Sequence, residues 1–217
     1  MKIEIKPSPR ALPDAERQAK VDEGGFGKYF TDHMVVADWN AESGWSDATL
    51  KGYEPLTLDP ASMVFHYGQE IFEGLKAYWQ PDGSISLFRP EMNGKRFANS
   101  AKRLALPELP VEDFVATIET LVKHDRGWVP PKVGSSLYIR PFMIATEVAI
   151  GVRPSKSAKY ILIACPVGAY FSTTSAVTVW ISTEYVRASI GGTGEAKCGG
   201  NYAADRKSTR LNSSHVS

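Results

Sequence analysis

Cysteine, charge of one sign and long apolar runs are all scarce in this sequence. Two cysteines, Cys165 and Cys198, are too few for a disulfide framework or a four-cysteine zinc site. The 25 Lys and Arg residues almost balance 24 Asp and Glu, so no basic field exists for binding nucleic acid. No apolar run approaches the ~20 residues of a membrane span, and the first 13 residues hold no secretory signal. We therefore expect a cytoplasmic protein that binds neither nucleic acid nor membranes. The four histidines have no metal-ligand spacing, so we expect no metal.

The composition is that of a folded chain. Of the 217 residues, 43% are hydrophobic and 23% are charged, which is typical of globular rather than disordered proteins. A compact chain of this length would bury roughly 70% of its unfolded surface. The length therefore allows one large domain or two small ones.

Local patterns predict the elements of the first two thirds. Residues 1–25 are polar and rich in proline and glycine, and we interpret them as an arm with at most one short helix near residues 15–21. Residues 30–39 are apolar enough for a strand, and residues 40–53 have the composition of a loop. Residues 61–74 carry apolar side chains near helical spacing.

Residues 76–79 and 84–88 flank the segment QPDG, which predicts a hairpin. Apolar stripes predict helices at residues 91–104 and 111–123, the second with the clearest amphipathic pattern. Strands are expected at residues 136–148, 160–165 and 177–181. This order favours an α+β domain over residues 26–167, with a mostly antiparallel sheet and two helices. The small polar residues 168–175 would form an interdomain linker.

The densest glycine cluster, residues 191–202, surrounds Lys197 with small residues. Ala196 and Cys198 stand where a phosphate-binding P-loop needs glycine and a hydroxyl residue, and the third glycine of a dinucleotide fingerprint is missing. Lysine is suited to Schiff-base chemistry, and small neighbours allow a planar cofactor to approach the backbone. From these residues alone, a solvated lysine on a surface loop stays open as the commoner alternative.

Five ordered segments carry a resemblance to a known family. They are HYGQEIFEGLKAY (66–78), LFRP (87–90) followed by Arg96, SLYIRP (136–141), CPVGAY (165–170) and GEAKCGGNY (194–202). Together they resemble the branched-chain amino acid aminotransferases, which are fold-type IV pyridoxal-phosphate enzymes, over roughly residues 26–204. The resemblance implies pyridoxal 5′-phosphate as cofactor and transamination of leucine, isoleucine and valine with 2-oxoglutarate. It also implies a homodimer or larger oligomer.

The resemblance implies a role for each matched residue. Lys197 would hold the cofactor covalently and then move a proton, Arg96 would bind the cofactor phosphate, and Tyr202 would hydrogen-bond the cofactor's phenolate oxygen. A pocket for the branched side chain would be lined by Phe30, Tyr67, Phe72, Tyr138 and Val167, and Arg140 beside Tyr138 would bind a second carboxylate. For the aromatic residues, ordinary core packing remains the alternative.

The resemblance also divides the end of the chain. Residues 176–205 would begin a cofactor-binding domain that is truncated here, and residues 206–217 have the composition of a non-native tail. In the family, the acidic residue that pairs with the pyridine nitrogen lies beyond the segment that matches residues 194–204. This sequence does not contain that region, so we expect an inactive fragment. The alternatives are a D-amino acid aminotransferase or an aminodeoxychorismate lyase of the same fold, or a non-catalytic dimerising domain. Val167 and the Tyr138–Arg140 pair favour the branched-chain enzymes.

Overall fold

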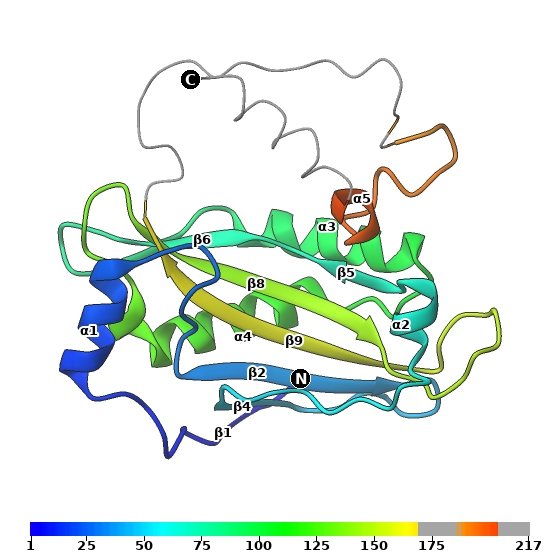
Figure 1. The fold of residues 1–217 in the computed structure, drawn as a ribbon, viewed down its shortest axis with the longest axis horizontal. Coiled ribbons are helices and arrows are strands. Elements are labelled where there is room, and N and C mark those ends of the chain that lie inside the picture. The colour runs from blue at the N-terminus through cyan, green and yellow to red at the C-terminus, as the bar shows by residue number, and fades with distance from the viewer. Residues whose placement is uncertain (169–185, 187, 204–217) are drawn as a thin grey trace.

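The computed structural model describes residues 1–168, 186 and 188–203 (Figure 1). The predicted strand at residues 177–181, nearly all of the predicted linker and the tail lie outside the described residues. Within the described part, nine strands form one sheet in the order β1-β4-β2-β9-β8-β6-β7, with β3 paired to β2 and β5 paired to β8. The strands are β1 (Ile3–Ile5), β2 (His33–Asn40), β3 (Gly44–Trp45), β4 (Ala48–Gly52), β5 (Glu70–Phe72), β6 (Leu75–Trp79), β7 (Ile85–Leu87), β8 (Ser136–Ala145) and β9 (Ser157–Val167).

The sheet confirms the predicted α+β class with mostly antiparallel strands. Only β1 and β4 pair in parallel among the described strands; every other pairing there is antiparallel. The predicted hairpin is β6–β7, and Gly83 supplies the positive φ of 81° that its turn requires.

Two long helices cover one face of the sheet, as Figure 1 shows. They are α3 (Pro90–Arg103) and α4 (Val111–His124), within a residue of the predicted bounds. Pro90 begins α3, where its missing N–H costs nothing, and α4 carries acidic residues in its first turn and basic residues in its last. The shorter helices are α1 (Asp14–Glu23), α2 (Met63–Tyr67), the 3-10 helix η1 (Arg126–Trp128) and α5 (Gly200–Ala203). Of the helices in the described ranges, none is long and apolar enough to cross a membrane.

Strand alternation divides the residues between two faces. Tyr160 and Leu162 of β9 belong to the main core, and Tyr160 meets Thr117 of α4 at 3.0 Å between their hydroxyl oxygens. Ile161, between them, joins a smaller cluster with Met34 and Ile144 on the opposite face. That second face carries no long helix in the described part of the chain, and it positions the candidate site.

Two predicted segments differ from the structure. Residues 40–53 were expected to form a loop but contain β3 and β4, because the alternating burial of Ala48 and Leu50 makes even the short segment ATLKG a half-buried strand. Residues 61–74 contain only a five-residue helix, since Gly68 ends it in the left-handed conformation with φ of 55°. The chain then extends into β5.

The predicted N-terminal arm is packed against the domain. Its helix is α1, and β1 pairs with β4, which the sequence pattern did not indicate. The Met1 ammonium lies 2.6 Å from an oxygen of Asp113 on α4. Further along, the Ser8 amide donates to Nε2 of buried His33, whose Nδ1 contacts Asp125 at 2.6 Å. That contact with Asp125 raises the pKa of His33.

An aromatic cluster should dominate the stability of this domain. The ring of Phe97 is fully buried, with centroids 5.3 Å from Phe114 and 5.8 Å from Tyr160, so it joins both helices to the sheet. We expect Phe97→Ala to lower the free energy of unfolding by about 3–5 kcal/mol. Phe88→Ala, at a ring that is 76% exposed, should change it by less than about 0.5 kcal/mol. Urea unfolding measures both, and equal losses would contradict the assignment.

Candidate active site

The peptide of Lys197 is fastened between α3 and β5. Its amide donates to the Ser100 hydroxyl at 2.9 Å, and its carbonyl accepts from the Phe72 amide at 2.9 Å. Both contacts join residues far apart in the sequence. The loop that carries the lysine is therefore held by the helix face and by the strand edge together.

The Lys197 amine lies against two aromatic rings. Nζ is 4.3 Å from the centroid of Phe72 and 4.4 Å from that of Tyr202, and it donates to the Tyr202 hydroxyl at 3.2 Å. The two rings meet edge to face with centroids 5.2 Å apart. Ring faces attract a cation, so the amine is held at a defined place while its surroundings remain partly open.

Further contacts fix the loop on both sides of the lysine. Arg103 donates to the carbonyls of Gly191 and Gly192 at 2.9 and 3.0 Å. The amide of Gly199 donates to a carboxylate oxygen of Glu70, and a Cβ at Gly199 would collide with that same oxygen. At Gly199 the absence of a side chain therefore lets the Glu70 carboxylate lie against the backbone. Burial raises the pKa of Glu70, an effect that the Gly199 amide and the charge of Arg140 oppose.

Arg96 on α3 is paired with a buried carboxylate. Its Nε and Nη2 atoms lie 2.5 and 2.8 Å from the two oxygens of Glu73. Glu73 is fully buried, whereas the Arg96 side chain is 54% exposed. The Glu73 carboxylate raises the pKa of Arg96, and Tyr202 is close enough to add to this effect.

Arg140 lies on the sheet face that lacks a long helix in the described part of the chain. It donates to the Tyr138 hydroxyl at 3.1 and 2.8 Å, and its guanidinium stacks 4.5 Å from the centroid of Phe72. Tyr138 and Arg140 are two apart on β8, so they share one face. The Tyr138 hydroxyl also lies over Gly74, where a Cβ would collide with it.

Two concavities meet at Arg140. A groove of about 640 Å³ is lined by Glu70, Phe72, Arg140, Phe142, Ile163, Gly199, Tyr202 and Ala203. A smaller pocket of about 190 Å³ is lined by Phe26, Gly27, Phe30, Tyr138, Arg140, Ile163, Ala164 and Cys165. Burial raises the pKa of the Cys165 thiol, which disfavours the reactive thiolate there.

The structure brings together most of the predicted site residues. Lys197, Tyr202, Phe72, Arg140 and Tyr138 form one chain of contacts, and Arg96 pairs with Glu73, the residue that follows Phe72.

Three other predicted residues lie at the margin. Phe30 lines the smaller pocket and stacks on Tyr53 at 5.1 Å between ring centroids. Tyr67 lies on α2 with its hydroxyl donating to the Ile150 carbonyl, and Val167 is buried at the end of β9 opposite Ser136. Neither Tyr67 nor Val167 lines the two concavities, so their predicted roles stay predictions.

Sequence reasoning missed three residues that shape the site. Ser100 holds the Lys197 amide, Glu73 pairs with Arg96, and Glu70 accepts from Gly199. Glu70 and Glu73 both lie in the segment 66–78 that carries part of the resemblance. The signal available was a pair of acidic residues on either side of the apolar pair Ile71 and Phe72, where an unpaired buried charge would be costly.

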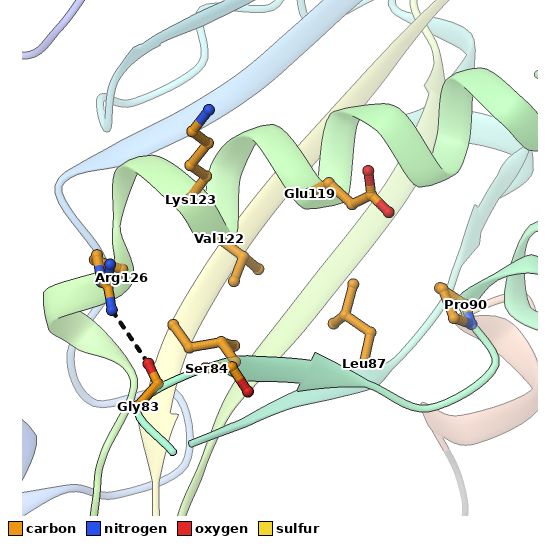
Figure 2. Close-up of a pocket in the computed structure, with 9 residues that line it drawn as sticks. Gly83, Ser84, Leu87, Pro90, Glu119, Val122, Lys123 and Arg126 are labelled. Carbon is orange, nitrogen blue, oxygen red and sulfur yellow. Dashed lines mark hydrogen bonds between the residues drawn. The ribbon is translucent and has the colours of Figure 1, made fainter. Parts of the chain in front are cut away.

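A third concavity lies away from Lys197. Figure 2 shows this groove of about 670 Å³ between the β6–β7 turn and α4. Arg126 donates to the Gly83 carbonyl at 3.3 Å, Val122 points toward the hairpin, and Lys123 points away from it (Figure 2). Its lining contains none of the predicted site residues, so volume alone does not identify the active site.

Comparison with known proteins agrees with this geometry. No family model matches the chain. A probable branched-chain-amino-acid aminotransferase of Streptomyces coelicolor is 56% identical over 204 residues, covering 93% of this chain and 56% of the relative. The branched-chain-amino-acid aminotransferase of Mycolicibacterium smegmatis is 57% identical over 193 residues, covering 88% of this chain and 52% of the relative. The chain thus spans about half the length of the curated relatives it matches.

Solved structures share the fold. A bacterial branched-chain amino acid aminotransferase complexed with N-(5'-phosphopyridoxyl)-L-glutamate matches with a TM-score of 0.57 and 29% identity, covering 76% of this chain and 51% of that one. The Escherichia coli enzyme matches with a TM-score of 0.56 at 23% identity, covering 81% of this chain and 54% of that one, which shows the fold alone. The fold is therefore that of the class IV aminotransferases. Within that class, the chain belongs to the branched-chain amino acid aminotransferase family.

The Ser100 contact gives a direct test of the loop's attachment. Ser100→Ala would leave the Lys197 amide without its acceptor, at a cost of about 1–3 kcal/mol for a desolvated donor. We expect the Lys197 amide to exchange with deuterium at least about tenfold faster, as measured by hydrogen-exchange mass spectrometry. Lys102→Ala, at an exposed site of the same helix, is the matched control. Equal exchange in both variants would contradict the clamp.

Proposed function

We propose that this chain supplies the lysine-bearing part of a pyridoxal-phosphate-dependent transaminase. Its substrates would be L-leucine, L-isoleucine and L-valine, with 2-oxoglutarate as the amino-group acceptor. One observation carries the proposal: the Lys197 amine is held between the Phe72 and Tyr202 rings, on a peptide clamped by two separate elements. The names of the curated relatives support it.

The chemistry of the donors fits pyridoxal phosphate. A free primary amine, an arginine whose outer edge faces away from its carboxylate partner, and a tyrosine hydroxyl are the groups that an aldehyde, a phosphate and a phenolate oxygen require. Gly199 adds no side chain of its own beside the lysine, and its amide donates to the Glu70 carboxylate. When bound, the cofactor supplies an electron sink for the carbanion at the substrate α-carbon.

Three residues of the site then have defined roles. Lys197 Nζ binds the cofactor aldehyde, and as a free amine it accepts and returns the proton of the substrate α-carbon. The Tyr202 hydroxyl accepts a hydrogen bond from Nζ and so orients that amine. Arg96 binds the phosphate through its outer edge.

The groove must accept two kinds of substrate side chain. Phe72, Phe142 and Ile163 give it an apolar wall that suits a branched aliphatic chain. Arg140 lies at the edge of this wall, held by Tyr138, and can donate to the second carboxylate of glutamate or 2-oxoglutarate. The site thereby offers apolar contact and a fixed cation side by side. The cytoplasmic location and the oligomer expected above remain predictions.

Chemical trapping tests the lysine assignment. Incubation of the 217-residue chain with pyridoxal 5′-phosphate, reduction with borohydride and peptide mass mapping should place the label on Lys197. The Lys197→Arg variant should lose it, while Lys102→Arg should keep it. Label on another lysine, or label retained by Lys197→Arg, would refute the assignment.

Substrate choice tests the role of Arg140. In the protein that the complete gene encodes, Arg140→Met should lower kcat/KM for 2-oxoglutarate by about 100-fold, because a charge-assisted hydrogen bond is lost. The value for 4-methyl-2-oxopentanoate should fall less than about threefold, since an apolar side chain gains no such bond. Arg126→Met, outside the site, is the control. Equal losses for both acids would contradict the role, and turnover of D-alanine in place of L-leucine would favour a D-amino acid enzyme.

A further inference from the structure

Glu73 is the most deeply buried charge beside the candidate site among the described residues. Its carboxylate is fully buried, and it accepts from Arg96 Nε and Nη2, from Asn93 Nδ2 at 2.8 Å and from the Gly74 amide at 3.2 Å. Its own amide donates to the Pro141 carbonyl at 2.8 Å. A buried ion is stable only when its hydrogen-bonding capacity is met, and these donors come from the strand segment and from α3. The Glu73 side chain therefore has one well-defined orientation.

The pairing with Arg96 leaves a specific edge of the guanidinium free to face outward. Nε–H and one hydrogen of Nη2 point at Glu73, so one hydrogen of Nη1 and the second hydrogen of Nη2 lie side by side on the end-on edge. The Arg96 side chain is 54% exposed, so this edge is accessible. A planar fork held in this way presents two parallel N–H groups to an oxyanion.

Glu73 is also linked to the lysine through its neighbour in sequence. Phe72 holds the Lys197 carbonyl with its amide and touches the amine with its ring, and Glu73 follows it directly. The consecutive residues 72 and 73 therefore set the positions of the amine and of the guanidinium. Their spacing is fixed by one short segment of backbone.

We propose that Glu73 is a positioning residue that aims the outer edge of Arg96 at the phosphate of the cofactor. This inference rests on the proposed function, because it takes the cofactor to be pyridoxal 5′-phosphate. Glu73 touches neither the phosphate nor the amine in this assignment and acts only through Arg96. Coulomb repulsion between Glu73 and a phosphate acts in the opposite sense, and the direction of the measured change shows which effect is larger.

Comparison of pyridoxal 5′-phosphate with pyridoxal separates positioning from general structural support. Both aldehydes can react with Lys197, but only one carries the phosphate. We expect Glu73→Gln, which keeps the shape but turns a donor toward Arg96, to weaken binding of pyridoxal 5′-phosphate by about tenfold. Binding of pyridoxal should stay within about twofold. Absorbance titration of the 217-residue chain gives both dissociation constants, and circular dichroism checks the fold.

Two further variants sharpen the test. In an Arg96→Gln background, Glu73→Gln should cause no additional loss of the phosphate-dependent affinity, because its only route is removed. Asp125→Asn is the control, because it breaks another buried pair, the one between Asp125 and His33. It should not weaken the binding of either aldehyde selectively. If Glu73→Gln does not fold, Asn93→Ala removes a single donor to Glu73 and should still weaken the phosphate form by about twofold to threefold.

Every outcome decides the proposal. The proposal is supported if Glu73→Gln selectively weakens the binding of pyridoxal 5′-phosphate and if this effect disappears in the Arg96→Gln background. Equal weakening of both aldehydes, unchanged binding or tighter binding of the phosphate form by Glu73→Gln overturns it while leaving the proposed function intact. The same holds if the fallback variant Asn93→Ala shows no selective loss. If the unmodified chain binds neither aldehyde at Lys197, the proposed function fails, and the assignment of Glu73 fails with it.

Discussion

The register between β8 and β9 is the constraint on which the rest of the molecule depends. Ten consecutive residue pairs, from Ser136 opposite Val167 to Ala145 opposite Ala158, fix the two longest strands against each other. Because side chains alternate, this register sends Leu137 and Ile139 into the helix-covered core and leaves Tyr138 and Arg140 on the other face. A slip of one residue would bury the arginine among apolar side chains. Packing and site geometry are therefore decided by the same pairing.

Much of the fold could be predicted because its strongest patterns are local. The apolar stripes of α3 and α4 and the QPDG turn each act within a few residues, and all three predictions are confirmed. The short strands β1, β3 and β4 were missed because two to five residues carry too little pattern, and their pairing partners lie elsewhere in the chain. Gly68 could have indicated the early end of α2, since its left-handed conformation stops a helix.

The candidate site likewise contains residues that the sequence indicated and residues that it did not. The glycine setting of Lys197 marked it as unusual, but only the resemblance selected its chemistry and that of Arg96 and Tyr202. No local pattern could identify Ser100 or Glu73, because each acts through one contact with a residue distant in sequence. A serine on a helix and a glutamate after a phenylalanine are common, and their importance lies in what the fold places opposite them.

The face that α3 turns toward the lysine loop has a consequence for how this sequence can change. Arg96, Ser100 and Arg103 follow one another at intervals of four and three residues, so they lie on one face and reach Glu73, Lys197 and the glycine carbonyls respectively. Substitution at one of them removes one contact. Insertion or deletion of one residue between them rotates the residues on one side of the change by about 100° relative to those on the other, so the three can no longer share one face. Homologous helices should therefore vary in residue type at other positions while keeping their length between these three.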